Sequence, residues 1–95
     1  MRQYETMVVI NSEMEDEQTA ELVAKYTTLI TEQGGQEPQV QEMGKRRLAY
    51  DIQKHHEGYY VLWQYAAGTD FTRELERTLR LEENVLRYLT VRLGE

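Results

Sequence analysis

The sequence predicts an α+β domain whose elements follow the order strand, helix, strand, strand, helix, strand (βαββαβ). Four stretches carry apolar or aromatic residues at alternate positions, the period of two that is typical of strands. Two other stretches repeat apolar residues at helical spacing, as amphipathic helices do. A chain of 95 residues is long enough for one small hydrophobic core, so we expect a single domain over residues 1–95.

The first strand is expected from Tyr4 to Ile10, and both of its faces are partly apolar, which favours a central place in the sheet. A helix should follow from about Glu15 to Glu32, with an apolar stripe along one side. Ser12, three residues before Glu15, fits a capping box at the start of this helix. Gly34-Gly35 should end the helix, because glycine readily adopts the left-handed turn that closes a helix.

A hairpin of two strands is expected in the middle of the chain. Its first strand covers roughly Pro38 to Ile52, and Gly44 inside that stretch predicts a bulge or a bend. Its second strand runs from Tyr59 to Tyr65, where aromatic and β-branched residues suit a pleated sheet. The charged segment from Gln53 to Gly58 should form the loop between the two strands.

The second helix should begin after a loop over residues 66–70, with Thr69 or Asp70 as its N-cap. It should end near residues 81–84, and the last strand should run from Val85 to Leu93. Apolar residues spaced four apart define the buried side of this helix, namely Phe71, Leu75 and Leu79.

This element order predicts a ferredoxin-like split βαβ fold, in which both crossovers place a helix on the same face of a four-stranded antiparallel sheet. The residues expected to face the helices are Thr6, Val8, Val61, Trp63 and Tyr65. The opposite face should be polar if it meets only water. Large apolar or aromatic side chains are expected there instead, which favours a partner-binding surface over a wrong face assignment or cover by loops. They are Met7, Val9, Tyr60, Leu62, Leu89 and Val91.

The distribution of charge points to a second interaction. The net charge is -6, with 17 acidic and 11 basic residues, so the chain as a whole does not resemble a strongly basic nucleic-acid binder. Much of the positive charge nevertheless falls on the central hairpin, where arginine forks match the geometry of phosphate. An ordinary solvated surface is the alternative. The candidate RNA contacts are Arg2, Lys45, Arg46, Arg47, Lys54, His55, His56, Arg87 and Arg92.

Several classes of function find no support in the sequence. There is no cysteine, so neither a disulfide framework nor a thiolate metal site is possible. None of the common motifs of nucleotide-binding loops, serine hydrolases or zinc proteases occurs, and His55 and His56 should point apart in an extended chain. The acidic run from Glu13 to Glu17 suits a solvated helix start better than a metal site. We therefore expect no cofactor and no metal. We also expect no membrane partner, since no run of about 18 apolar residues occurs.

Four segments together resemble the family of the bacterial small-subunit ribosomal protein six. The resemblance covers nearly the whole chain, with the same element order. In many relatives the residue after the tyrosine of the central motif is proline, whereas this chain has Asp51. The segments are Arg2-Gln3-Tyr4-Glu5, Gly44-Lys45-Arg46-Arg47-Leu48-Ala49-Tyr50, Gly58-Tyr59-Tyr60 and Asn84-Val85-Leu86-Arg87.

The resemblance implies a ferredoxin-like fold, no enzymatic activity and a place in the cytoplasmic ribosome. It also implies binding to the central domain of small-subunit ribosomal RNA, jointly with small-subunit ribosomal protein eighteen. That partner is basic, and the open apolar face of the sheet would be at least part of its docking site. The free protein is expected to be a monomer.

Two other readings remain open at the level of sequence. The first is a ferredoxin-like ligand-sensing or acylphosphatase-like domain, but residues 11–17 after the first strand are acidic and would repel an anion. The second is an adaptor that forms homo-oligomers through the open sheet face.

Overall fold

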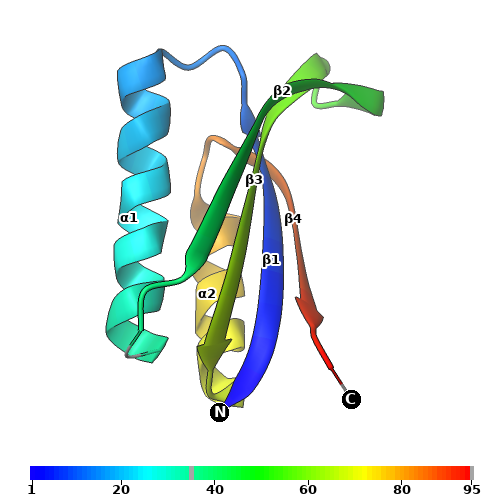
Figure 1. Ribbon diagram of the computed structural model, residues 1–95. Helices are drawn as coiled ribbons and strands as arrows, with labels where there is room; N and C mark the ends of the chain where they lie inside the picture. The colour runs from blue at the N-terminus through cyan, green and yellow to red at the C-terminus, as the bar shows by residue number, and fades with distance from the viewer. Residues whose placement is uncertain (35, 95) are drawn as a thin grey trace.

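The structure is a computed structural model that describes residues 1–34 and 36–94. It confirms the predicted element order and antiparallel sheet (Figure 1). The elements are β1 (Arg2–Asn11), α1 (Asp16–Gly34), β2 (Gln39–Ile52), β3 (His55–Ala67), α2 (Thr69–Leu81) and β4 (Val85–Arg92).

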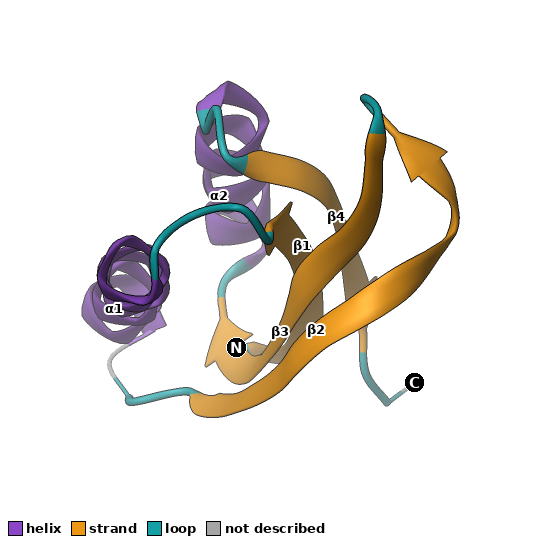
Figure 2. Ribbon diagram, turned by 90° about the horizontal axis from the view of Figure 1, so that it is seen from above, coloured by secondary structure: helices purple, strands orange, loops and turns teal. Residues whose placement is uncertain are grey.

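The four strands form one sheet in the order β2-β3-β1-β4, so β1 is central as predicted. All three pairings are antiparallel. Both helices cover the same face of the sheet, and the other face is open (Figure 2). The two crossovers therefore produce the ferredoxin-like arrangement that the sequence predicts.

The core lies between the sheet and the helices. The five residues expected to face the helices are all buried, which confirms the face assignment on that side. Trp63 and Tyr26 are its largest buried side chains, and the indole Nε1 of Trp63 donates a hydrogen bond to Thr27 Oγ1 at 2.9 Å. The buried Thr6 hydroxyl lies 2.7 Å from Tyr65 Oη. These polar atoms therefore enter the core with partners, as burial requires.

The start of α1 differs from the prediction. The backbone N–H of Glu15, the residue before the helix, donates to Gln18 Oε1 at 3.3 Å, which is one half of a capping box. Ser12 takes no part in this capping interaction, and its hydroxyl donates to the Glu57 carbonyl at 3.4 Å. The predicted capping box of Ser12 and Glu15 is wrong because Asn11 Oδ1 accepts from the Glu13 N–H at 2.9 Å and forms a turn first. The helix ends at Gly34, and Gly35 lies outside the described residues.

The start of α2 also differs from the prediction. Strand β3 continues to Ala67, so the connection is Gly68 alone and the loop expected over residues 66–70 is wrong. Gly68 occupies the N-cap position in an extended conformation, with no side-chain cap. Thr69 and Asp70 already belong to the helix, so neither caps it.

The connection between β2 and β3 is shorter than predicted. Only Gln53 and Lys54 join the strands, with φ angles of 49° and 70°. Positive φ at both positions is typical of the two-residue turn that matches the twist of a hairpin. The predicted loop from Gln53 to Gly58 is therefore wrong, and the histidines lie in β3.

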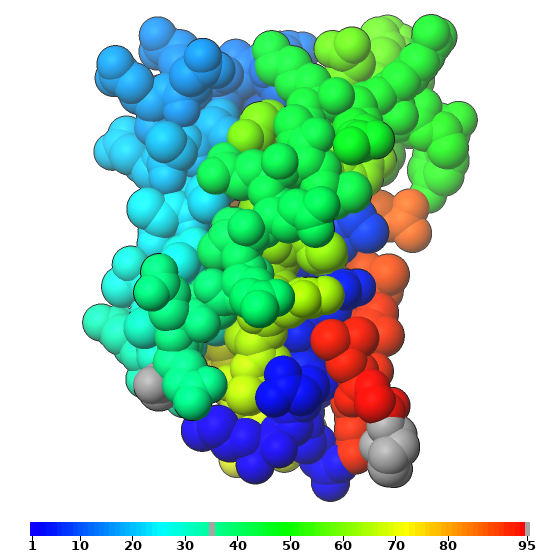
Figure 3. All heavy atoms as spheres, viewed as in Figure 1, coloured from blue at the N-terminus to red at the C-terminus, as the bar shows by residue number. Residues whose placement is uncertain are grey.

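Two irregularities bend this hairpin. Glu42 pairs with Val61 and Gly44 with Tyr60, so Met43 is an extra residue, and the φ of +82° at Gly44 favours glycine. This confirms the predicted bend. Nearer the tip, residues 48–51 lie between the Arg47–Glu57 and Ile52–His55 pairs and have no partner in the register. The hairpin consequently curves, and its green atoms overhang the orange start of β4 (Figure 3).

Candidate interaction surface on the hairpin and the open sheet face

An apolar row crosses the open face of the sheet. The strand register places Leu62, Met7 and Leu89 side by side on β3, β1 and β4. Leu89 is 54% exposed, and Val91 farther along β4 is 44% exposed. Met7, Leu62 and Tyr60 are half-buried. We call Met7, Tyr60, Leu62, Leu89 and Val91 the open apolar face.

A shallow hollow of about 190 Å³ lies at one side of the open apolar face. Its walls are mainly apolar and include Arg87, so an apolar group could enter it close to a cationic residue. The lining residues are Met7, Val9, Tyr60, Arg87, Tyr88 and Leu89.

Val9 belongs to this side of the sheet but is buried, with 6% of its surface exposed. A Cβ atom added to Gly58 would collide with the Val9 side chain and come within 3.4 Å of Leu48. Leu48 is itself 8% exposed, so two buried apolar side chains lie beside Gly58. The expectation that Val9 is exposed is wrong because the hairpin folds over it. The buried role of Leu48 was missed; its signal was an apolar residue between Arg46 and Tyr50 on one strand face.

The tip of the hairpin is held by polar contacts on both sides. Arg87 Nη1 donates to Tyr50 Oη at 2.6 Å, which joins β4 to the curved segment. His56 Nδ1 lies 2.8 Å from Asp51 Oδ1, and His55 Nδ1 lies 3.5 Å from Glu13 Oε2. The two histidines thus point to different carboxylates, as strand alternation predicts. Within the described residues, no group of three histidine or acidic side chains could hold a metal ion.

The predicted cations divide between two ends of the sheet. Arg2 pairs with Ala67, and Arg92 pairs with Tyr4, so both lie near the chain termini. Asn11, at the opposite end of β1, is about 30 Å from Arg2 at strand spacing. The structure gathers the remaining seven on the hairpin and the start of β4, namely Lys45, Arg46, Arg47, Lys54, His55, His56 and Arg87.

Four of these cations make neither an ion pair nor a side-chain hydrogen bond with any described residue, whereas Arg87 is hydrogen-bonded to Tyr50. The four are Lys45, Arg46, Arg47 and Lys54; we call them the basic hairpin. All four are exposed. Arg46 pairs with Gly58 and Lys45 with Tyr59, so successive cations point to opposite sides of β2. The basic hairpin therefore presents charge along a strand edge, where it can approach phosphates from either side.

Comparison with known proteins decides the family. The family model described as ribosomal protein S6 matches residues 3–92. The chain belongs to the ribosomal protein S6 family. The small ribosomal subunit protein bS6 of Moorella thermoacetica is 46% identical over 95 residues, which cover 100% of this chain and 97% of that protein. The bS6 protein of Caldanaerobacter subterraneus subsp. tengcongensis is 47% identical over 95 residues, with 100% of both chains covered.

A solved member of the ribosomal protein S6 family has the same fold. The crystal structure of 30S ribosomal protein S6 from Thermotoga maritima matches with a TM-score of 0.86 and 32% sequence identity. The match covers 97% of this chain and 87% of that one. The family resemblance inferred from the four sequence segments is therefore confirmed.

Membership in the ribosomal protein S6 family makes this protein a structural component of the small ribosomal subunit, in the cytoplasmic ribosome, and not an enzyme. The acylphosphatase-like alternative is wrong for this reason. None of the helices that the structure describes is long and apolar enough to cross a membrane.

Proposed function

We propose that this protein binds the central domain of small-subunit ribosomal RNA jointly with small-subunit ribosomal protein eighteen. One observation carries the RNA contact: the basic hairpin holds four exposed cations without ion pairs among the described residues, in a chain of net charge -6. Cations that are already paired would lose their partners on binding phosphate, whereas these are ready to bind.

The open apolar face supports the protein partner. Its exposed leucine and valine lie on β4, beside the half-buried Met7 and Leu62 of the inner strands. An apolar surface of this kind gains free energy when a partner removes it from water. A basic partner would also offset the net charge of -6, which by itself opposes RNA binding. The free protein should then be a monomer that binds RNA weakly, and the two proteins should bind cooperatively.

The experiment is a salt titration of RNA binding in the presence of the partner. Each phosphate contact contributes about 0.7–0.9 to the slope of log affinity against log salt. The double variant Arg46→Ala with Arg47→Ala should bind more weakly, and its slope should be flatter by roughly one to two units. Filter binding gives the affinities, and circular dichroism checks that the variant is folded.

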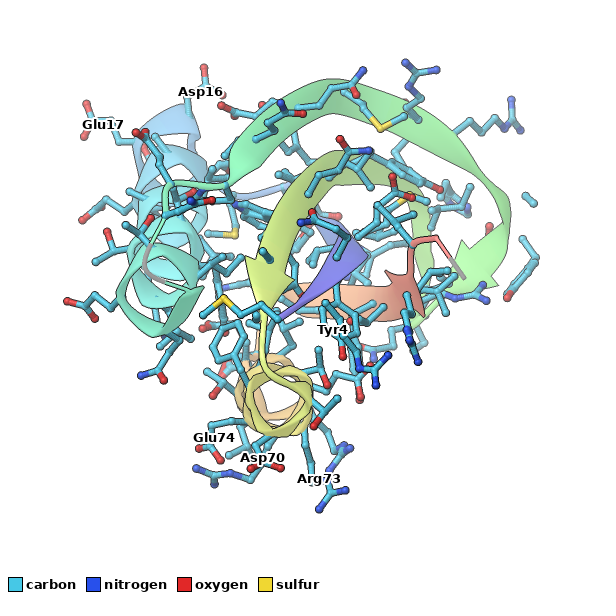
Figure 4. The ribbon with its side chains drawn as sticks, turned by 60° about the horizontal axis from the view of Figure 1, so that its bottom comes forward. Tyr4, Asp16, Glu17, Asp70, Arg73 and Glu74 are labelled. Atoms are coloured by element: carbon cyan, nitrogen blue, oxygen red, sulfur yellow. The ribbon has the colours of Figure 1, made fainter. Side chains whose placement is uncertain are left out.

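A matched control separates local contact from net charge. Arg73→Ala with Arg77→Ala removes the same charge from α2, where Arg73 points away from the sheet (Figure 4). This control should keep the wild-type slope. If both double variants change the slope equally, only net charge matters, and if neither changes it, the basic hairpin is not the RNA contact.

A further inference from the structure

One hydrogen bond ties the tip of the hairpin to the opposite edge of the sheet. It runs from Arg87 Nη1 to Tyr50 Oη, 2.6 Å apart and 37 residues apart in the chain. Tyr50 lies in residues 48–51, which have no partner in the register with β3. The bond therefore restrains the part of the hairpin that the β-ladder leaves unrestrained.

The apolar packing beneath the hairpin holds it at one point but does not fix its angle to the rest of the sheet. The buried side chains of Leu48 and Val9 both lie beside Gly58, and their packing there is apolar. Apolar contacts are non-directional, so the hairpin could tilt about Leu48 with little loss of buried area. A hydrogen bond depends steeply on distance and angle. Among the described residues, the bond between Arg87 and Tyr50 is thus the hydrogen bond on the open side that favours one tilt of the hairpin.

On the helix side, two weaker contacts hold the hairpin close to its tip. His55 Nδ1 lies 3.5 Å from Glu13 Oε2, and the Ser12 hydroxyl donates to the Glu57 carbonyl at 3.4 Å. The bond between His56 and Asp51 stays within the hairpin, so it cannot set the angle to the sheet. The short bond from β4 is the stronger restraint on the tip.

We propose that Arg87 is a positioning residue that latches the hairpin through Tyr50 and so aims the basic hairpin at RNA phosphates. This inference rests on the proposed function. It assigns Arg87 a supporting role in place of the direct phosphate contact expected from charge alone. Arg87 also lines the hollow beside Leu89, so a partner docked there would shield the latch from water. Shielding strengthens a hydrogen bond, which couples partner docking to the orientation of the hairpin.

The free protein gives the first test. Tyr50→Phe and Arg87→Ala should each speed amide hydrogen exchange in residues 46–57 by about two- to tenfold, the range of one net hydrogen bond. Amides at the centre of the β1–β3 pairing should keep their wild-type rates. The matched controls are Tyr88→Phe and Arg80→Ala, because Arg80 Nε donates to Tyr88 Oη at 3.3 Å on the helix side of the sheet. These controls should leave residues 46–57 unchanged.

RNA binding with the partner gives the second test. Both latch variants should weaken binding by about two- to tenfold with an unchanged salt slope, and the double variant should be no weaker than either single variant. A direct phosphate contact predicts instead that Arg87→Ala flattens the slope by about 0.7–0.9 while Tyr50→Phe binds normally. That result would overturn the proposal.

Failure of the latch and failure of the proposed function are distinguishable. Unchanged exchange in both variants rejects the latch, whatever the RNA result. If the wild-type protein does not bind RNA with its partner, the proposed function and the positioning role fail together. The exchange rates then still decide whether the latch exists.

Discussion

Single side chains in this protein combine burial with specific polar contacts, and Tyr26 shows the consequence most clearly. Its ring is buried in the core, and its hydroxyl donates to Glu82 Oε1 at 3.2 Å. Burial, followed by the charge and hydrogen bond of Glu82, raises the pKa of Tyr26 well above its ordinary value. Both effects favour the neutral phenol, so the native state resists its ionisation.

This raised pKa predicts a loss of stability at alkaline pH. The unfolded chain releases the Tyr26 proton near pH 10, while the native state retains it. The stabilisation is therefore complete below about pH 10 and declines as the pH rises toward the native pKa. Tyr26→Phe should lower the free energy of unfolding by about 0.5–1.5 kcal/mol at pH 7. It should also make the decline above pH 10 shallower.

Urea unfolding of both proteins between pH 7 and pH 11 measures this effect. Parallel stability curves over the whole range would show that Tyr26 ionises equally in both states. A variant that loses stability faster than wild type above pH 10 would contradict the sign of the shift.

At the scale of elements, the hairpin depends on a close approach at Gly58. A Cβ at this position would collide with the side chain of Val9, which belongs to the central strand β1. Gly58→Ala should therefore destabilise the protein by about 1–3 kcal/mol, as overpacking does. Gly68→Ala is the matched control, because a Cβ there meets no atom within 4 Å and the backbone φ is -76°.

Denaturant unfolding compares the two glycine variants. We expect a clearly larger loss for Gly58→Ala than for Gly68→Ala. Equal losses would mean that the hairpin moves away from β1 without cost, and Leu48 would then not act as a pivot.

At the scale of the whole molecule, one face of the sheet packs in the core and the other face is open. Leu89→Glu on the open apolar face should weaken binding of ribosomal protein eighteen while changing the free energy of unfolding little, because Leu89 is 54% exposed. Leu62→Glu should act in the same direction. Leu75→Ala is the contrasting variant, since Leu75 is 1% exposed in the core and its truncation should cost about 2–5 kcal/mol of stability.

A pull-down with the partner, run beside denaturant melts, separates these outcomes. Loss of binding and loss of stability in equal measure for Leu89→Glu would place this residue in the core. Normal binding by a stable Leu89→Glu variant would remove it from the partner-binding surface.

The element order and the face of the sheet that the helices cover could be predicted from the amino-acid sequence alone. These features follow from local periodicity: the alternation from Tyr4 to Ile10 and the helical spacing of Phe71, Leu75 and Leu79 need no distant contact to be recognised. The bend at Gly44 was predictable for the same reason, because glycine in a strand marks an irregular backbone. Family membership could also be predicted, because it depends on short segments whose order and spacing are part of the amino-acid sequence.

The direction of the hairpin and the residues that it covers could not be predicted in this way, because they depend on contacts between distant segments. The burial of Val9 and Leu48 beside Gly58 and the bond from Arg87 to Tyr50 depend on the strand register and on residues 48–51, which have no partner in it. The separation of Arg2 and Arg92 from the other cations depends on which strands are neighbours. Register and bulges arise from pairing between segments that are distant in the sequence. The free energy of that pairing cannot be inferred from the residue pattern of one strand.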